Sequence, residues 1–168
     1  QLLERPCEIY MADMRVQVRA SGSAYRRRTL TPDLALEQVP SWGGPCPRKF
    51  MHVLQITPYY PPTWAYGGIP RIVSGLSRAL VARDVQVSVL TTDALDGQAR
   101  AQVASPRVEG GVCIHTVPNW SNDLAYRHQL FLPRGARGVL DDLEDVDVVH
   151  LHGHRHLLNN VAVRWARN

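Results

Sequence analysis

The 168-residue chain lacks the features that mark a secreted or membrane-spanning protein. Its three cysteines, Cys7, Cys46 and Cys113, are odd in number and widely spaced, which argues against a disulfide framework. No apolar run approaches the roughly 20 residues that a transmembrane helix needs. The first residues also lack the basic start and apolar run of a signal peptide. We therefore expect a protein of a reducing compartment, the cytoplasm.

The net positive charge of the chain is concentrated in its N-terminal part. The net charge is +4 and the isoelectric point is about 9.3. Residues 1–50 hold eight Lys or Arg and five Asp or Glu, whereas residues 51–168 hold eleven and ten. The high isoelectric point therefore describes the N-terminal part, and we expect no nucleic acid as a partner.

The first fifty residues differ in character from the rest. They contain one short alternating stretch at 14–19, three arginines at 26–28 and a Pro/Gly-rich run at 40–47. Without a sustained apolar face, burial cannot offset the entropy lost on ordering. We expect residues 1–50 to form a disordered or non-native leader and residues 51–168 to form the domain. A basic arm at residues 26–28 that binds anionic lipid or nucleic acid stays open as an alternative, although three arginines fall short of the about four to eight of a lipid-binding cluster.

From residue 51 onward, short apolar runs alternate with amphipathic stretches. We expect strands at residues 52–57, 85–90, 110–117 and 146–151, the third of them opened by a turn. We expect helices from Pro70 to about residue 81, at 135–144 and at 157–165, with a polar and aromatic connection at 118–132. This alternation predicts an α/β fold, a Rossmann-like parallel sheet with flanking helices and right-handed crossovers.

Functional groups in such a fold gather at the carboxyl ends of the strands, here in the loops after Thr57 and Leu151. The first loop ends in Gly67 and Gly68, directly before a helix. Glycine lets a ligand approach the backbone, and the free amides of the first helical turn favour an anion. The loop lacks both the G-x-G-x-x-G fingerprint and the phosphate loop, which disfavours simple NAD or ATP binding. A Gly-Gly pair is also common in ordinary turns.

Four aromatic residues surround the glycines: Tyr59, Tyr60, Trp64 and Tyr66. They either pack the loop onto the sheet or form a wall against which a sugar or an acceptor stacks. The sequence leaves both interpretations open.

The second loop belongs to a segment with four alternating histidines: His150, His152, His154 and His156. A metal site would need them on one face of an extended strand, but Gly153 predicts a turn, and no neighbouring Cys or carboxylate completes a ligand set. We expect no metal. His152 should face the crevice, with His154 and Arg155 in the following turn. A neutral imidazole there can donate a hydrogen bond to a hydroxyl or phosphate, and an arginine can hold phosphate bidentately.

Three segments, residues 51–96, 119–126 and 147–153, closely resemble the N-terminal domain of the family 4 glycosyltransferases, two-domain enzymes of the GT-B architecture. The specific feature is the order of Thr-Pro-Tyr-Tyr-Pro-Pro at 57–62, Tyr-Gly-Gly at 66–68 and Val-Val-His-Leu-His-Gly at 148–153. The resemblance implies transfer of a sugar from a nucleoside-diphosphate sugar to a glycan or lipid-linked acceptor. It implies retention of configuration, no metal, and no cofactor besides the nucleotide sugar as co-substrate.

The resemblance also implies roles for individual residues. Gly67 and Gly68 would lie near the diphosphate of the donor, and His152 would be the catalytic histidine of the cleft. The remaining candidates, on the acceptor side of the cleft, are Tyr66, Arg71, His154 and Arg155.

The chain departs from the pattern of the family in two ways. Asp84 stands where members often have glycine after the first helix, and the glutamate pair of the donor-binding domain is absent. We therefore expect the 168-residue chain alone to be inactive. Two alternatives stay open: a non-catalytic nucleotide- or carbohydrate-binding module, and a truncated reading frame without function. We also expect self-association through an exposed sheet edge, and peripheral contact with the inner face of a membrane stays open.

Overall fold

The computed structural model describes residues 6–11, 14–19, 51–153 and 156–167, the first two ranges by their backbone only. The strands are β1 (Pro6–Met11), β2 (Met14–Arg19), β3 (His52–Ile56), β4 (Gln86–Thr92), β5 (Arg107–Glu109), β6 (Val112–Val117) and β7 (Val148–Leu151). The helices are the 3-10 turn η1 (Trp64–Tyr66), α1 (Ile69–Val81), α2 (Asn122–His128), α3 (Ala136–Asp141) and α4 (Leu157–Ala166).

The strands form one mixed sheet in the order β2-β1-β7-β3-β4-β6-β5. The pairs β1–β7, β7–β3, β3–β4 and β4–β6 are parallel, whereas β2 and β5 run antiparallel to their neighbours. The sequence prediction of an α/β, Rossmann-like sheet with flanking helices is therefore confirmed. The crossovers from β3 to β4 and from β6 to β7 contain helices, as the alternating pattern predicted, whereas the connection from β4 to β6 contains β5 and no helix.

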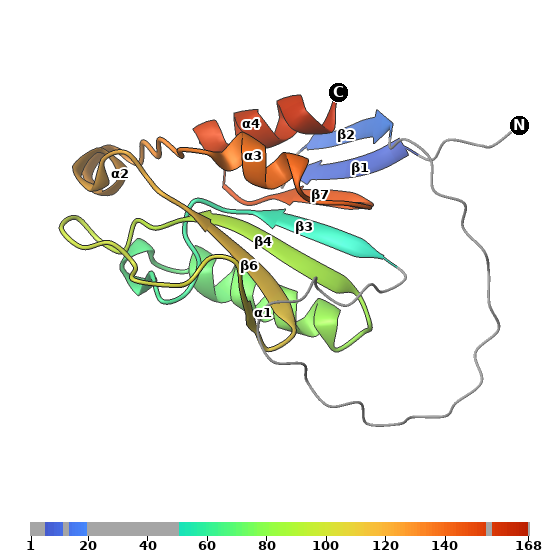
Figure 1. Cartoon of the computed structure of the whole chain (residues 1–168), viewed down its shortest axis with the longest axis horizontal. Helices are drawn as coiled ribbons and strands as arrows, with labels where there is room; N and C mark the ends of the chain where they lie inside the picture. The colour runs from blue at the N-terminus through green and yellow to red at the C-terminus, as the bar shows by residue number, and fades with distance from the viewer. Residues whose placement is uncertain (1–5, 12–13, 20–50, 154–155, 168) are drawn as a thin grey trace, which may run out of the picture.

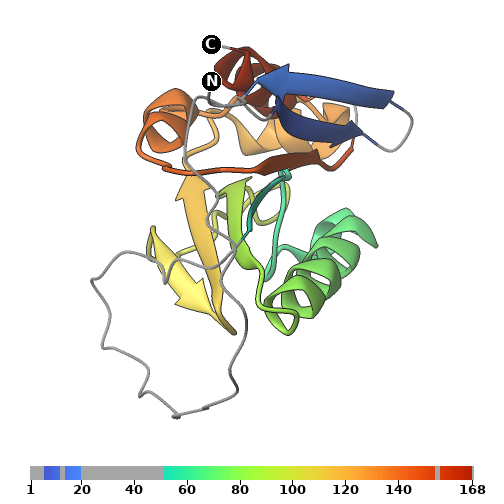
Figure 2. The ribbon, with the colours of Figure 1, turned by 90° about the vertical axis from the view of Figure 1, so that its right-hand side faces the viewer.

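Helices cover both faces of the central strands (Figures 1 and 2). Every residue of β3 is buried, as expected for a strand between two layers. Leu54 and Ile56 of β3 share one apolar core with Leu158 of α4. On the opposite face, Val89 of β4 shares a second core with Val73 of α1. The carboxyl ends of β3 and β7 lie side by side between these layers.

Helix α1 begins and ends where the sequence signals predicted. Gly68 is its N-cap residue and Pro70 lies in the first turn, where no amide partner is lost. After the helix, Asp84 adopts a φ of +60°, the left-handed conformation that glycine usually supplies at this position. Aspartate tolerates that conformation better than most residues, so the departure from the glycine of the family leaves the end of the helix intact.

Two elements differ from the expectation. The turn expected at the start of segment 110–117 is present, with φ of +57° at Gly110 and +79° at Gly111, but it joins β6 to an unpredicted partner strand, β5, in a hairpin. The expected connection at 118–132 contains α2. The Ser121 hydroxyl caps this helix by accepting a hydrogen bond from the amide of Leu124 at 3.3 Å. The carboxylate of Asp123, in the first turn, interacts favourably with the positive end of the helix dipole.

The N-terminal part also differs from the expected disordered leader, over residues 6–11 and 14–19. There β1 and β2 form a hairpin, and β1 pairs in parallel with β7. The physical reason is that the open edge of β7 offers unpaired backbone groups, and the alternating stretch at 14–19 suits a strand. The edge strands of this sheet are consequently β2 and β5. The arginines at 26–28 lie outside the described residues.

Cys113 of β6 is disulfide-bonded, contrary to the expectation from the cysteine spacing. Spacing along the chain did not reveal this bond because β6 is brought near distant segments only by the fold. The side chains of Cys7 and Cys46 lie outside the described residues. Within the described ranges, none of the helices combines the length and apolar character that a membrane crossing demands.

Candidate functional site

The two loops singled out by the sequence meet at the carboxyl edge of the sheet. The first follows β3 and runs to Gly68, and the second follows β7. The strands are neighbours, and the amide of His152 donates a hydrogen bond to the carbonyl of Ile56 at 2.8 Å. Further out, the rings of Tyr59 and His156 make an edge contact, with centroids 6.3 Å apart. The structure therefore brings both candidate loops into one region.

Gly67 and Gly68 leave an open surface at the start of α1. Gly67 has a φ of +82°, which favours glycine, and a Cβ placed on either residue would meet no atom within 4 Å. The first turn of a helix has amides without intrahelical partners, and the helix dipole adds positive character there. This part of the site can accept an anion against bare backbone.

Arg71 is the basic side chain of this helix start. It lies in the first turn of α1, and its guanidinium stands 5.9 Å from the centre of the Trp64 ring. Both side chains are exposed. A cation placed over an indole face keeps its charge available to a ligand. Arg71 therefore adds positive charge beside Gly67 and Gly68.

The aromatic residues of the loop divide between the two interpretations that the sequence left open. Tyr59 and Tyr60 are buried and pack the loop onto the sheet. Tyr66 stacks on Tyr59, with centroids 4.9 Å apart and an interplanar angle of 7°. Trp64 is 49% exposed and is free to contact a ligand.

The Tyr66 hydroxyl is buried and has no hydrogen-bond partner among the described residues. Burial, with smaller contributions from the Asp96 carboxylate and from Tyr126 and Tyr59, raises the pKa of Tyr66 to about 12. Tyr66 stays neutral at physiological pH. Its packing against Tyr59 favours a structural role for the ring.

His152 is the first residue beyond β7 and is half-buried. Burial, together with the nearby His150, lowers the pKa of His152 to about 3. The two rings lie 4.1 Å apart between centroids. His152 is therefore a neutral imidazole at physiological pH.

Gln55 is the side-chain partner of His152. Its side-chain oxygen contacts Nε2 of His152, and Gln55 is fully buried on β3. In this orientation of the amide, Nε2–H of His152 donates to Gln55 and Nδ1 keeps its lone pair, while the amide nitrogen of Gln55 is buried without a partner among the described residues. Gln55 was not predicted as a site residue. The available signal was its polar side chain inside the otherwise apolar run of β3.

The other predicted candidates have separate outcomes. His154 and Arg155 lie outside the described residues. His156 is buried at the start of α4, where its ring contacts Tyr59 and Phe131, so it belongs to the packing of the loop. The described part of the chain contains no group of three His, Cys, Asp or Glu side chains placed to hold a metal ion.

The chain matches a known protein family. Residues 67–168 match the family described as glycosyl transferase 4-like domain, and this range covers more than half of the chain. Searches of curated proteins and of solved structures found no significant match. The matched range contains Gly67 and Gly68, at the end of the first loop, and His152 of the second loop, whereas β3 and residues 57–66 lie before it. The chain belongs to the glycosyl transferase 4-like domain family.

Proposed function

We propose that this domain is the acceptor-side half of a retaining, metal-independent glycosyltransferase. It would help transfer a sugar from a nucleoside-diphosphate sugar to a glycan or lipid-linked acceptor. The observation that supports this most is the meeting of two loops at one edge of the sheet. One presents bare backbone at a helix start, and the other presents the neutral His152.

In this proposal Gly67 and Gly68 face the diphosphate of the donor. The open space over both residues lets phosphate oxygens reach the amides at the start of α1. Arg71, in the same turn, neutralises part of the charge that the departing diphosphate gains. The glycines act through the absence of side chains, because a methyl group would stand between phosphate and backbone.

His152 is proposed to bind and orient the transferred sugar. With Nε2–H directed at Gln55, the Nδ1 lone pair can accept a hydrogen bond from a sugar hydroxyl. The low pKa keeps the ring uncharged, so this acceptor persists through the physiological range. Such an interaction holds the reacting carbon relative to the diphosphate without a metal.

The 168-residue chain is proposed not to turn over by itself. Breaking a sugar–phosphate bond requires strong stabilisation of the departing charge. At the helix start, the described residues supply backbone amides and one guanidinium, that of Arg71. We attribute the remaining charge stabilisation to a donor-binding domain.

The test is ligand-observed NMR with UDP-glucose and GDP-mannose, each compared with its nucleoside monophosphate. We expect weak binding of the two nucleotide sugars, loss of that binding in Gly68→Ala, and no product release by the wild-type chain. Multiple turnovers by the chain would contradict the proposed inactivity. Tight binding without transfer, even when a donor domain is supplied, would favour a non-catalytic binding module. Equal binding of the monophosphates would contradict the role of the diphosphate.

A further inference from the structure

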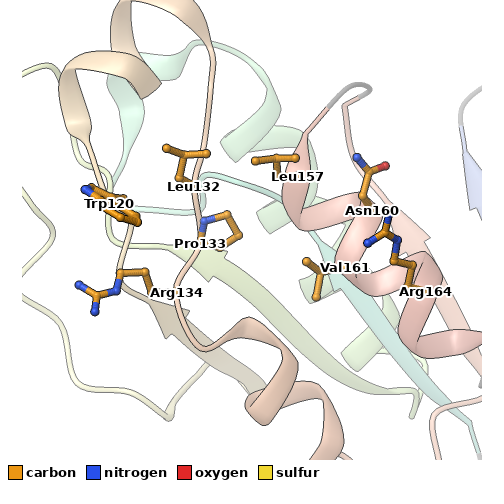
Figure 3. A pocket seen from close by; sticks show the side chains of 8 residues that line it. All are labelled: Trp120, Leu132, Pro133, Arg134, Leu157, Asn160, Val161 and Arg164. Atoms are coloured by element: carbon orange, nitrogen blue, oxygen red, sulfur yellow. The ribbon is translucent and has the colours of Figure 1, made fainter.

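A shallow groove of about 430 Å³ lies beside α4, on the face of the sheet opposite α1 (Figure 3). One wall comes from the segment between β6 and α3 and includes Trp120, Leu132 and Arg134. The other wall is the outer side of α4, with Asn160 and Arg164. Because the first wall begins shortly after β6 and the second shortly after β7, the groove opens at the same carboxyl edge as the site described above.

The groove presents exposed apolar side chains, and hydrogen bonds hold the backbone of Trp120 in place. Trp120 is 71% exposed and Leu157 is 40% exposed, which is unusual for side chains of this size. The backbone under the indole is fixed. The amide of Trp120 donates to the carbonyl of Leu132 at 2.9 Å, and the Arg100 guanidinium donates to the carbonyl of Trp120 at 3.1 Å. A flat ring on a fixed backbone is a suitable platform for the apolar face of a sugar.

The charged part of the groove is positive on both walls. The guanidinium of Arg134 stands 5.9 Å from the centre of the Trp120 ring, and Arg164 projects from the opposite wall (Figure 3). Among the residues that the structure describes, no acidic side chain lines the groove. Among the described residues neither arginine forms an ion pair. Two other exposed arginines nearby do: Arg127 with Asp123 and Arg137 with Asp141.

Two arginines without carboxylate partners across an apolar floor suit a ligand that supplies the negative charge itself. A guanidinium binds a carboxylate or phosphate through paired, charge-assisted hydrogen bonds. Asn160, on the same wall as Arg164, adds an amide that can donate to and accept from hydroxyl groups. The chemistry of the groove is therefore that of an anionic carbohydrate, with its ring on Trp120.

We propose that this groove binds the acceptor and selects an acceptor sugar that carries a carboxylate or phosphate group. The proposal rests on the glycosyltransferase function proposed above and specifies its acceptor class. The ring of the sugar lies on Trp120, and its anionic groups meet Arg134 on one wall or Arg164 on the other (Figure 3).

The test is calorimetric titration of the whole chain with two matched pairs of probes: trigalacturonate against neutral maltotriose, and glucose 6-phosphate against glucose. We expect at least one anionic probe to bind at least about tenfold more tightly than its neutral partner. Arg134→Gln and Arg164→Gln should each weaken that binding about tenfold, and Trp120→Ala should weaken it for every probe that binds. The control is Arg83→Gln, an exposed arginine beyond the end of α1, which should leave binding unchanged.

Several results would overturn the proposal. Equal affinity for anionic and neutral probes, or binding unaffected by both arginine variants, would show that the groove does not select charge. Absence of binding by all four probes would show that it takes no such sugar. Binding to vesicles of anionic phosphatidylglycerol, but to none of the sugars, would identify the groove as a membrane contact.

Failure here is distinguishable from failure of the proposed function. Nucleotide-sugar binding depends on Gly67 and Gly68, and Arg134→Gln and Arg164→Gln should leave it unchanged. Loss of acceptor selectivity with intact nucleotide-sugar binding would overturn only the groove. If the wild-type chain binds neither nucleotide sugar, the proposed function itself is overturned.

Discussion

The side-chain oxygen of Gln55 contacts Nε2 of His152, joining the centre of β3 to the first residue after β7. Gln55 is fully buried, and its partner is half-buried at the carboxyl edge of the sheet. Gln55 and His150 are register partners, and His152 follows two residues later, so the three side chains share one face. The pairing positions the imidazole that we propose binds the sugar.

A carboxylate in place of the Gln55 amide should change the titration of His152. In Gln55→Glu, a negative charge beside the ring favours the imidazolium, so we expect the pKa of His152 to rise from about 3 by more than about one unit. The measurement is an NMR titration of the imidazole protons. The control is Gln129→Glu, an exposed residue after α2. An unchanged pKa of His152 in Gln55→Glu would show that the two side chains do not interact in solution.

The same histidine should make the stability of the domain depend on pH. The pKa of His152 is about 3 in the folded chain and about 6.5 in an unfolded one. The unfolded chain therefore takes up the proton first. This contribution is fully present above about pH 6.5 and is lost as the pH falls toward about 3, with a slope of up to about 1.4 kcal/mol per pH unit.

Urea unfolding at several pH values measures this slope. Burial also lowers the pKa of His52, His115 and His150, so the wild-type chain should lose stability in acid at more than one site. We expect His152→Asn to flatten the slope between about pH 6.5 and 4, whereas His128→Asn on exposed α2 should not. Parallel curves for the wild type and His152→Asn would contradict the buried, neutral state of this ring.

Alanine at the two glycines should separate stability from binding. Gly67→Ala forces a side chain to a φ of +82° and should cost about 1–2 kcal/mol of unfolding free energy. Gly68 has a φ of −78° and open space around it, so Gly68→Ala should change that free energy by less than about 0.5 kcal/mol. Thermal unfolding checks both values. A strongly destabilised Gly68→Ala chain would mean that this glycine is needed for the fold rather than for a ligand.

Removal of the Tyr66 hydroxyl should not destabilise the domain. The hydroxyl is buried without a partner among the described residues, so Tyr66→Phe should leave the unfolding free energy unchanged or raise it by up to about 1 kcal/mol. Tyr66→Ala, in contrast, removes the stack on Tyr59 and should cost about 3 kcal/mol or more. Urea unfolding compares the two variants with the wild-type chain. Clear destabilisation by Tyr66→Phe would reveal an unrecognised partner of the hydroxyl.

The sequence predicted the central strands and α1 because these elements bury continuous apolar runs or one apolar stripe. The sequence missed α2, β5 and the pairing of β1 with β7, because each of these depends on a contact or a cap rather than on its own apolar pattern. The seven-residue α2 has no such stripe, and it forms because Ser121 caps it and Ala125 is buried beside Phe131. The short strand β5 exists only as the partner of β6. The pairing of β1 with β7 depends on which sheet edge is available, which local sequence does not specify.

The same distinction applies to the site. Gly67, Gly68 and His152 were predicted because they belong to short, recognisable segments, and the structure brings their loops together. Gln55 and Trp120 were missed because their roles come from contacts between distant segments. The pairing of β3 with β7 places Gln55 against His152. The groove beside Trp120 requires the docking of α4 against the segment that follows β6.

The most direct test of the central claim, that the two loops form one nucleotide-sugar site, is a protein-observed NMR titration of the ¹⁵N-labelled chain. UDP-glucose and GDP-mannose are added separately, and the amides of Gly67 and Gly68 are followed together with the ring nitrogens of His152. The account predicts that at least one of the two sugars perturbs both loops with the same concentration dependence, and that Nδ1 of His152 responds more than Nε2. Perturbation of one loop alone, or of neither, would contradict it.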